Sequence, residues 1–288
     1  MKLEGKFGGA EYGLNRNRSR VTAIMTLILS VLVLFASLAG ILIERIYKDV
    51  VSTGTITEFM SAGSVAQDII SVPLALLLVL LSVLFLKRPD YKVFITMLGL
   101  AGYFFYGYGL YLIHGQYTSI YLIYLIIFSL SIYSVVYGLL SFSAELIIRT
   151  SMPKASRNSI SIFLYFIVFM MGFAWIMRML PDISRHIPQA TYGVYILDLG
   201  IVFPSIIITA TLLIRSKPFG NILAGVVLIK TIMVCLSWGF AEFYVRMKEI
   251  TKGGYDMLAF PAILTTIGII FFVLYINKLK CNASIGQN

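Results

Sequence analysis

Five ionisable side chains stand inside or directly beside long apolar stretches of this sequence: Asp68, His114, Asp198, Lys230 and Glu242. A charged residue near the middle of a bilayer costs about 2.5–3.5 kcal/mol on insertion scales, so such residues usually face the interior of a helix bundle. There they bind an ion or a solute, relay a proton, or hold two helices together. These five residues are our candidate binding residues.

Lys230 is the clearest of the five. It lies in the middle of an apolar run that begins near Asn221, at a depth of roughly 14 Å for a helical rise of about 1.5 Å per residue. Asp198 lies about one turn from the outer end of the preceding run, so it lies less deep than Lys230. A long lysine side chain bridges much of this difference in depth. We therefore expect an Asp198–Lys230 pair with Glu242 above it. A buried pair that only fixes the packing of the two helices explains the same residues about equally well.

Asp68 and His114 are weaker candidates. Asp68 precedes an apolar run, where a carboxylate stabilises the positive end of the helix dipole and caps exposed amides. We predict this capping role ahead of a binding role. His114 follows a run rich in glycine and tyrosine, and Tyr117, Tyr121 and Tyr124 come shortly after it. These residues predict either an aromatic pocket that opens outward near His114 or a packed aromatic seam, and the seam is the simpler interpretation.

The sequence offers little for catalysis or for a metal. The two histidines lie far apart, and Cys235 and Cys281 have neither a metal-ligand nor a disulfide spacing. We find no Walker loop, dinucleotide fingerprint, nucleophile elbow or paired acidic motif. We therefore predict no metal, no cofactor and no catalytic residue, and we favour a protein that is not an enzyme. Asp198 and Glu242 are the two carboxylates that an intramembrane lipid-modifying enzyme would use, which keeps that alternative open.

The elements that must position these residues are apolar runs of about 20 residues, the length needed to cross a hydrocarbon layer of ~30 Å. The runs are too uniformly apolar for the strands of a barrel. Charged residues make up 12% of the chain, about half the share typical of a soluble domain. The sequence therefore predicts an all-α fold, a polytopic bundle of about eight transmembrane helices that contacts the lipid bilayer. The expected spans are 21–43, 69–86, 93–113, 120–140, 159–177, 194–214, 221–243 and 257–276.

The net charge of +10 lies in short segments between these runs, which argues against a nucleic-acid partner. Most of the 23 Lys and Arg residues fall on one side, in the two tails and in the connections after the second, fourth and sixth spans. Cytoplasmic connections carry such an excess. We predict a multi-pass protein of the cell membrane with both termini in the cytoplasm.

Two halves of the sequence resemble each other at an offset of about 130 residues. Asp68 and Pro73 correspond to Asp198 and Pro204, and the basic turn that ends at Pro89 corresponds to one that ends at Pro218. Both copies cross the membrane in the same direction. We therefore predict a parallel repeat of two four-helix units, 1–150 and 151–288. Repeats of this kind occur in transporters, with the binding site between them.

The segment around the second copy also resembles a family of uncharacterised bacterial membrane proteins. The cues are Asp198 and Pro204, then the Arg215-x-x-Pro218-x-Gly220 pattern, then Lys230, over about 40 residues. The first copy departs from this pattern, because Ala101 stands near the place that corresponds to Lys230. The resemblance implies eight spans and a bacterial source, and it implies no activity.

Three hypotheses for function remain open at this point. The first is a small-solute or ion carrier, or a membrane-embedded binder, with an outward-facing cavity near Asp198, Lys230 and Glu242. The second is a non-catalytic accessory or sensor subunit that holds another membrane protein. The third is the intramembrane lipid-modifying enzyme.

Overall fold

The computed structural model describes residues 13–251 and 256–282 of the chain. In this part of the chain, eight helical segments are long and apolar enough to cross a membrane, which confirms the all-α polytopic bundle. The protein is an integral membrane protein. The spans are α1 (Arg16–Leu42), α3 (Glu58–Lys87), α4 (Tyr91–Ile113), α5 (Tyr121–Leu139), α7 (Lys154–Arg185), a broken span (Tyr192–Ile214), α10 (Pro218–Met247) and α11 (Asp256–Lys278).

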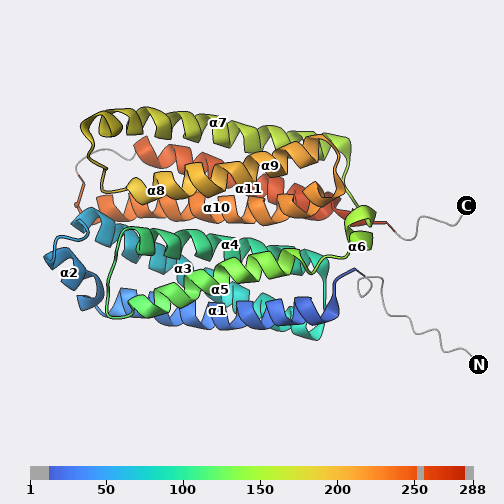
Figure 1. Ribbon diagram of the computed structural model, residues 1–288, viewed down its shortest axis with the longest axis horizontal. Coiled ribbons are helices and arrows are strands. Elements are labelled where there is room, and N and C mark those ends of the chain that lie inside the picture. Colours follow the sequence, from blue (N-terminus) through green and yellow to red (C-terminus); the bar gives the residue numbers. More distant parts are fainter. Residues whose placement is uncertain (1–12, 252–255, 283–288) are drawn as a thin grey trace, which may run out of the picture.

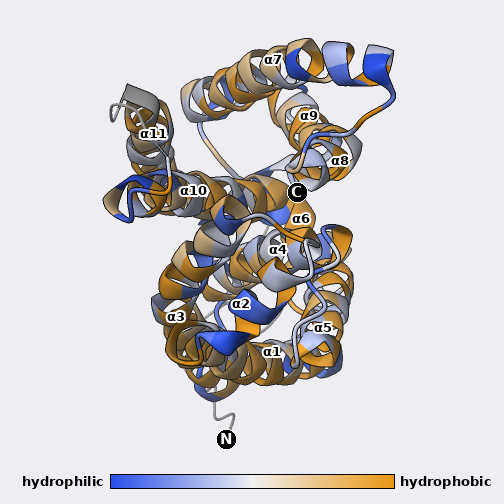
Figure 2. Cartoon of the chain, turned by 90° about the vertical axis from the view of Figure 1, so that its left-hand side faces the viewer, coloured by the Kyte–Doolittle hydropathy of each residue, from blue (hydrophilic) through white to orange (hydrophobic). Residues whose placement is uncertain are grey.

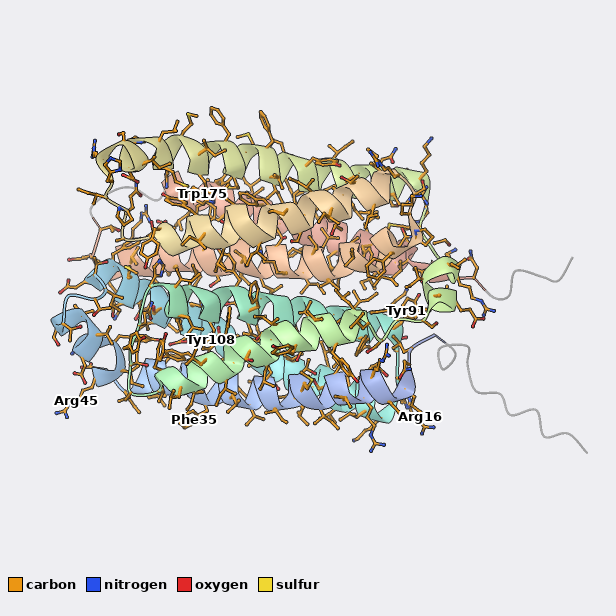
Figure 3. All side chains as sticks on the ribbon, viewed as in Figure 1. Arg16, Phe35, Arg45, Tyr91, Tyr108 and Trp175 are labelled. Carbon is orange, nitrogen blue, oxygen red and sulfur yellow. The ribbon has the colours of Figure 1, made fainter. Side chains whose placement is uncertain are left out.

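Hydrophobic residues occupy much of the length of the helices (Figure 2), and many of the large apolar side chains are exposed. Phe35, Phe169 and Ile270 are among them, each more than half exposed. Such a surface is not stable in water, but it suits contact with lipid tails, where every helix satisfies its own backbone hydrogen bonds. Arg16 and Arg45 mark opposite ends of the bundle, with Phe35 on the surface between them (Figure 3).

Two groups of helices build the bundle (Figure 1). The first group comprises α1, α3, α4 and α5, and the second comprises α7, the broken span, α10 and α11. Within each group, the helices that follow one another along the chain contact each other. The chain passes between the groups through a short helix, α6 (Ala144–Arg149), and a two-residue strand, β1 (Thr150–Ser151).

Strand β1 pairs with β2 (Lys280–Cys281) in antiparallel register, Thr150 opposite Cys281. This pairing ties the segment after α11 to the connection between the groups. Asn221 strengthens the junction, because its side-chain amide donates a 2.9 Å hydrogen bond to the carbonyl of Thr150. The sequence did not predict these strands, since a two-residue strand has no periodicity to detect.

Helix α3 begins at Glu58, eleven residues before the start that we expected. Thr57 is its N-cap, with a side chain that accepts a hydrogen bond from the backbone N–H of Met60. Asp68 therefore lies in the third turn of α3, and our prediction that it caps the helix is wrong. The polar residues Ser64, Gln67 and Asp68 concealed the first turns because they face protein rather than lipid. A short amphipathic helix, α2 (Arg45–Ser52), precedes α3.

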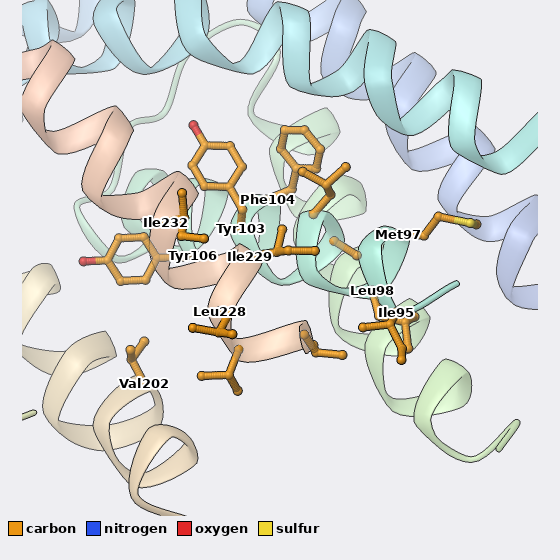
Figure 4. Close-up of a cluster of buried hydrophobic side chains, with 14 of the residues drawn as sticks. Ile95, Met97, Leu98, Tyr103, Phe104, Tyr106, Val202, Leu228, Ile229 and Ile232 are labelled. Carbon is orange, nitrogen blue, oxygen red and sulfur yellow. The ribbon is translucent and has the colours of Figure 1, made fainter. Parts of the chain in front are cut away.

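Helices α4 and α10 form the seam between the two groups. Glycines on α4 let the helices approach closely: a Cβ built at Gly99 would lie 2.6 Å from the Cβ of Ile229. One turn further, Gly102 leaves room for the Lys230 stem, at 3.4 Å from such a Cβ. Ile229 and Ile232 of α10 lie in the same buried cluster as Tyr103 and Tyr106 of α4 (Figure 4). The position of Lys230 is thus fixed by the glycine face of α4.

The sixth span is not one regular helix. It consists of α8 (Tyr192–Leu197), a π-helical turn η1 (Asp198–Val202) and α9 (Phe203–Ile214). A π-turn holds one residue more than an α-turn, and such turns are frequent at functional sites. Asp198 is the first residue of this one. Pro204 follows Asp198 by six positions, whereas Pro73 follows Asp68 by five positions in the helix α3. The Asp–Pro spacing that is longer by one residue thus falls in the span that contains the π-turn.

We expect deletion of Gly200 to be tolerated. Gly200 lies in the π-turn, and no atom would lie within 4 Å of an added Cβ there. Its removal converts the π-turn into an α-turn and leaves the flanking helical segments on their present faces. Thermal unfolding in detergent should give a midpoint within a few degrees of the unmodified protein.

The matched control is deletion of Ile208, which is exposed but lies in the regular helix α9. Because an α-helix has about 3.6 residues per turn, this deletion rotates every following residue by about 100° and should cause aggregation or a large loss of stability. Equal damage from both deletions would show that η1 does not hold a removable extra residue.

Candidate functional site: a cavity between the two helix groups

A cavity of about 540 Å³ lies between the two helix groups. Its walls are the first turns of α3 and the last turns of α4 from the first group, and α7, the broken span and α10 from the second. It extends from Thr251, after α10, inward to Lys230 near the middle of that helix. This volume falls within the roughly 300–1,000 Å³ typical of small-molecule sites, and most of the lining is apolar and aromatic, as in such sites.

Lys230 lies at the inner end of the cavity. Its ammonium nitrogen is 4.8 Å from the centre of the Tyr106 ring, a cation–π contact. The three ion pairs among the described residues are Glu44–Lys48, Glu145–Arg149 and Glu242–Arg246, and Lys230 is in none of them. The direct Asp198–Lys230 pair that we expected is therefore not formed. The two charges act on each other at longer range.

Asp198 already has neutral hydrogen-bond donors. The indole N–H of Trp175 on α7 donates to its Oδ2 at 2.8 Å, and the hydroxyl of Tyr106 on α4 approaches the same carboxylate. Tyr106 thus lies between Asp198 and Lys230, with its hydroxyl toward the acid and its ring face toward the ammonium. The acid is satisfied by uncharged groups, and the ammonium keeps N–H donors for another partner.

Glu242 lies nearer the outer end of the cavity, one helical turn from Arg246, with which it forms an ion pair. The indole N–H of Trp238 donates to its other carboxylate oxygen at 3.3 Å. Glu242 does not approach Lys230. Arg178, exposed on α7, lies over the ring of Trp175 at 5.5 Å and adds a second positive charge at the wall. Cations therefore stand at both ends of the cavity.

His114 connects the two helix groups at the outer end. Its Nε2 accepts a hydrogen bond from the backbone N–H of Gly193 at 3.2 Å, and its ring stands edge-on to Tyr192 at 5.4 Å. Burial lowers the pKa of His114 to about 4, because the charged form loses water on both sides. The ring is therefore neutral at pH 7, as an acceptor at Nε2 requires. Through these contacts His114 links the end of α4 to the start of α8.

Of the five candidate residues, Asp198, Lys230, Glu242 and His114 line this one cavity, and Asp68 does not. Asp68 is 1% exposed and lies behind Tyr111, within the first helix group. The aromatic residues near it are packed against each other: Tyr108, Tyr111 and Tyr124 have ring centres 5.2–5.5 Å apart. Tyr117, in contrast, is 73% exposed. The packed seam is therefore confirmed for Tyr124 of α5, while Tyr103, Tyr106 and Tyr111 of α4 line the cavity.

The sequence missed the aromatic residues that organise the site. Tyr106 is one of several tyrosines in an apolar run. Trp175, near the end of another run, is buried, and its indole N–H donates to Asp198. A signal for Trp175 existed: a lone Trp two residues before the end of an apolar run resembles an anchor in the headgroup layer, but its indole N–H also suits a buried acid. Choosing between the two needs the neighbouring helix.

A second hollow, of about 480 Å³, lies between α2 and the loop before α5. Its charged residues, Arg45 and Asp49, are exposed, and it contains none of the candidate residues. The cavity between the helix groups is therefore the better candidate. It combines apolar walls with an available ammonium group at depth, so its chemistry is that of binding an anion. No protein family, curated protein or solved structure matches this chain.

Proposed function

We propose that this protein is a membrane-embedded binder or carrier of a small organic anion that has an apolar body. One observation carries the proposal: Lys230 lies at the inner end of a cavity, and no carboxylate of the described residues forms an ion pair with it. A lysine at that depth is costly unless a partner compensates its charge. An anionic ligand would supply that partner.

An anion fits this site better than a cation. A cation would have to use Asp198, whose carboxylate already accepts from Trp175 and faces the Tyr106 hydroxyl, or Glu242, which is paired with Arg246. Lys230 forms no ion pair with a carboxylate among the described residues. Charge-assisted hydrogen bonds to an ammonium are roughly twice as strong as neutral ones. The charge distribution therefore supports a carboxylate or a similar head group at the inner end.

An apolar body fits the walls. Residues from α7 and α9 that face the cavity include Ile167, Met171, Phe203 and Ile206. The tail of an amphipathic ligand would contact this side, away from the polar residues on α3. Methionine and aromatic side chains adapt to ligands of different shape. The protein therefore need not select a single chain length.

The architecture supports a carrier. The cavity lies between two groups of four helices, the place where transporters built from repeats bind their substrates. The Asp–Pro spacing is one residue longer in the second half than in the first, and the π-turn accounts for that residue. The two segments are therefore compatible with the duplication that we propose. With the resemblance to eight-span bacterial proteins and the positive-inside rule, we propose a bacterial cell-membrane protein whose cavity opens outward.

The test uses the two tryptophans of the chain. Trp175 and Trp238 both line the cavity, so intrinsic fluorescence reports on its occupancy. Protein in lipid nanodiscs would be titrated with octanoate, octylamine and octanol, with empty nanodiscs measured for each. We expect a saturable change with octanoate and a weaker, non-saturating one with the amine and the alcohol.

Equal responses to all three probes would mean partition into lipid and would contradict the proposal. If octanoate binds but does not move into proteoliposomes, the proposal of a binder stands and the proposal of a carrier is rejected. The accessory-subunit alternative predicts no response to the probes, together with co-purification of another membrane protein.

A further inference from the structure

The first helix group contains a buried acid that the cavity does not use. Asp68 is 1% exposed in the middle of the group. Its Oδ2 accepts a 2.5 Å hydrogen bond from the Tyr47 hydroxyl on α2, and its Oδ1 accepts one of 3.2 Å from Tyr111 on α4. Ser37 on α1 is a third hydroxyl near the same carboxylate.

No cation faces Asp68 from any helix that packs against α3. Helix α1 offers Ser37 and Gly40, α2 offers Tyr47, and α4 offers Tyr103, Tyr108 and Tyr111, while Tyr124 stands behind them on α5. On α10, Lys230 acts on Asp198 and is not among the charges that act on Asp68. Within the described residues, the carboxyl group is thus enclosed by hydroxyls and aromatic rings alone.

An ionised carboxylate without a counter-charge is costly at this depth. A proton removes the charge and leaves a group that hydroxyls satisfy well. A metal cation fits less well, because no group of three or more metal-ligating side chains is found among the described residues and Asp68 lines neither of the two cavities described above. The observations therefore favour the proton as the ligand of this acid.

Tyr111 connects this acid to the cavity. Its side chain lines the cavity, and its hydroxyl donates to Asp68 Oδ1 and to the carbonyl of Ser64 at 3.0 Å. A proton that arrives from the cavity would bind to the Tyr111 oxygen, and the original hydroxyl proton of Tyr111 would pass to Asp68 Oδ1. One proton enters and one carboxylate is neutralised. The reverse sequence returns the proton to the cavity.

We propose that Asp68 is a proton-binding site that exchanges its proton with the cavity through Tyr111. Helix α2 closes the other side, because Tyr47 holds the acid from there and lies 3% exposed. Asp198, in the other helix group, differs from Asp68 in that it lies within range of the Lys230 charge. The two halves would then hold different ligands, a proton in one and the anion in the other.

Infrared difference spectroscopy tests the proposal directly. A protonated carboxyl group has a C=O band separate from the amide bands. In membranes at pH 7 we expect such a band, its shift in D₂O, and its loss in Asp68→Asn. The control is Asp49→Asn, which removes an exposed acid on α2 and should leave the band unchanged.

Tyr111→Phe should keep the band but slow its exchange in D₂O at least several-fold, and this variant serves even if Asp68→Asn does not fold. A band that survives in Asp68→Asn, or exchange that is unaffected by Tyr111→Phe, would overturn the proposal. A carboxylate signal at pH 7 that responds to sodium would overturn it too. None of these readouts depends on the binding of octanoate, so a failure here is separate from a failure of the proposed function.

Discussion

Lys230→Met should weaken octanoate binding by about 10- to 100-fold, because a hydrogen bond to a charged group contributes about 1.5–3 kcal/mol. Methionine keeps the length of the side chain and its contact with Gly102 and Tyr106, so packing changes little. It removes the ammonium group that we propose to bind the anion at the inner end of the cavity. The measurement is the fluorescence titration in nanodiscs.

Two comparisons separate binding from folding in this experiment. Lys217→Met makes the same chemical change on the exposed turn before α10, and it should leave octanoate binding unaltered. The unfolding midpoint of Lys230→Met should equal or exceed that of the unmodified protein, since an uncompensated charge has been removed. A Lys230→Met protein that binds octanoate normally would refute the proposed role of the lysine. One that fails to accumulate would favour the purely structural interpretation.

Gly40→Ala should destabilise the protein by about 3 kcal/mol. A methyl group on Gly40 would overlap the Oδ2 atom of Asp68 and lie 3.0 Å from the Tyr47 hydroxyl. The tip of a free side chain would move aside at little cost, but Asp68 is held by two tyrosines. Moving it breaks these hydrogen bonds inside the bundle. Thermal unfolding in detergent measures the loss.

Gly63→Ala is the control, because nothing lies within 4 Å of a Cβ at Gly63 on α3. It should stabilise the helix slightly, by about 0.5–1 kcal/mol, through the lower backbone entropy of alanine. Adding Asp68→Ala to Gly40→Ala should recover part of the loss, since it removes the atom that the methyl meets. Additive effects of these two changes would show that Gly40 and Asp68 do not interact.

The spans themselves could be predicted well from the sequence, because lipid imposes a length and a composition that are read residue by residue. The largest differences were the end of α7, eight residues later than expected, and the start of α3, eleven residues earlier. At α3 the reason is clear. Its first turns carry polar residues that face Tyr111 and Gln116 rather than lipid. Asp68 therefore looked like a helix cap when it is a buried acid. Hydropathy identifies the part of a helix that can face lipid. It underestimates the length of a helix whose end faces neighbouring helices.

The identities of the costly residues were likewise visible in the sequence, and four of the five line one cavity. Their partners were not visible. Depth along each helix made Asp198 and Lys230 look like a pair, but depth says nothing about rotation. Tyr106 and Trp175 satisfy the acid because of how α4 and α7 are turned against α8 and α10.

The sequence alone thus determined that the chain lies in lipid, where its helices run and which side chains carry an energetic cost. Only the tertiary structure decided which of those side chains meet, because contacts between helices depend on rotation and on close approach at glycines such as Gly99 and Gly102. Hydropathy does not encode either quantity, since a residue buried against a helix and one exposed to lipid are equally apolar.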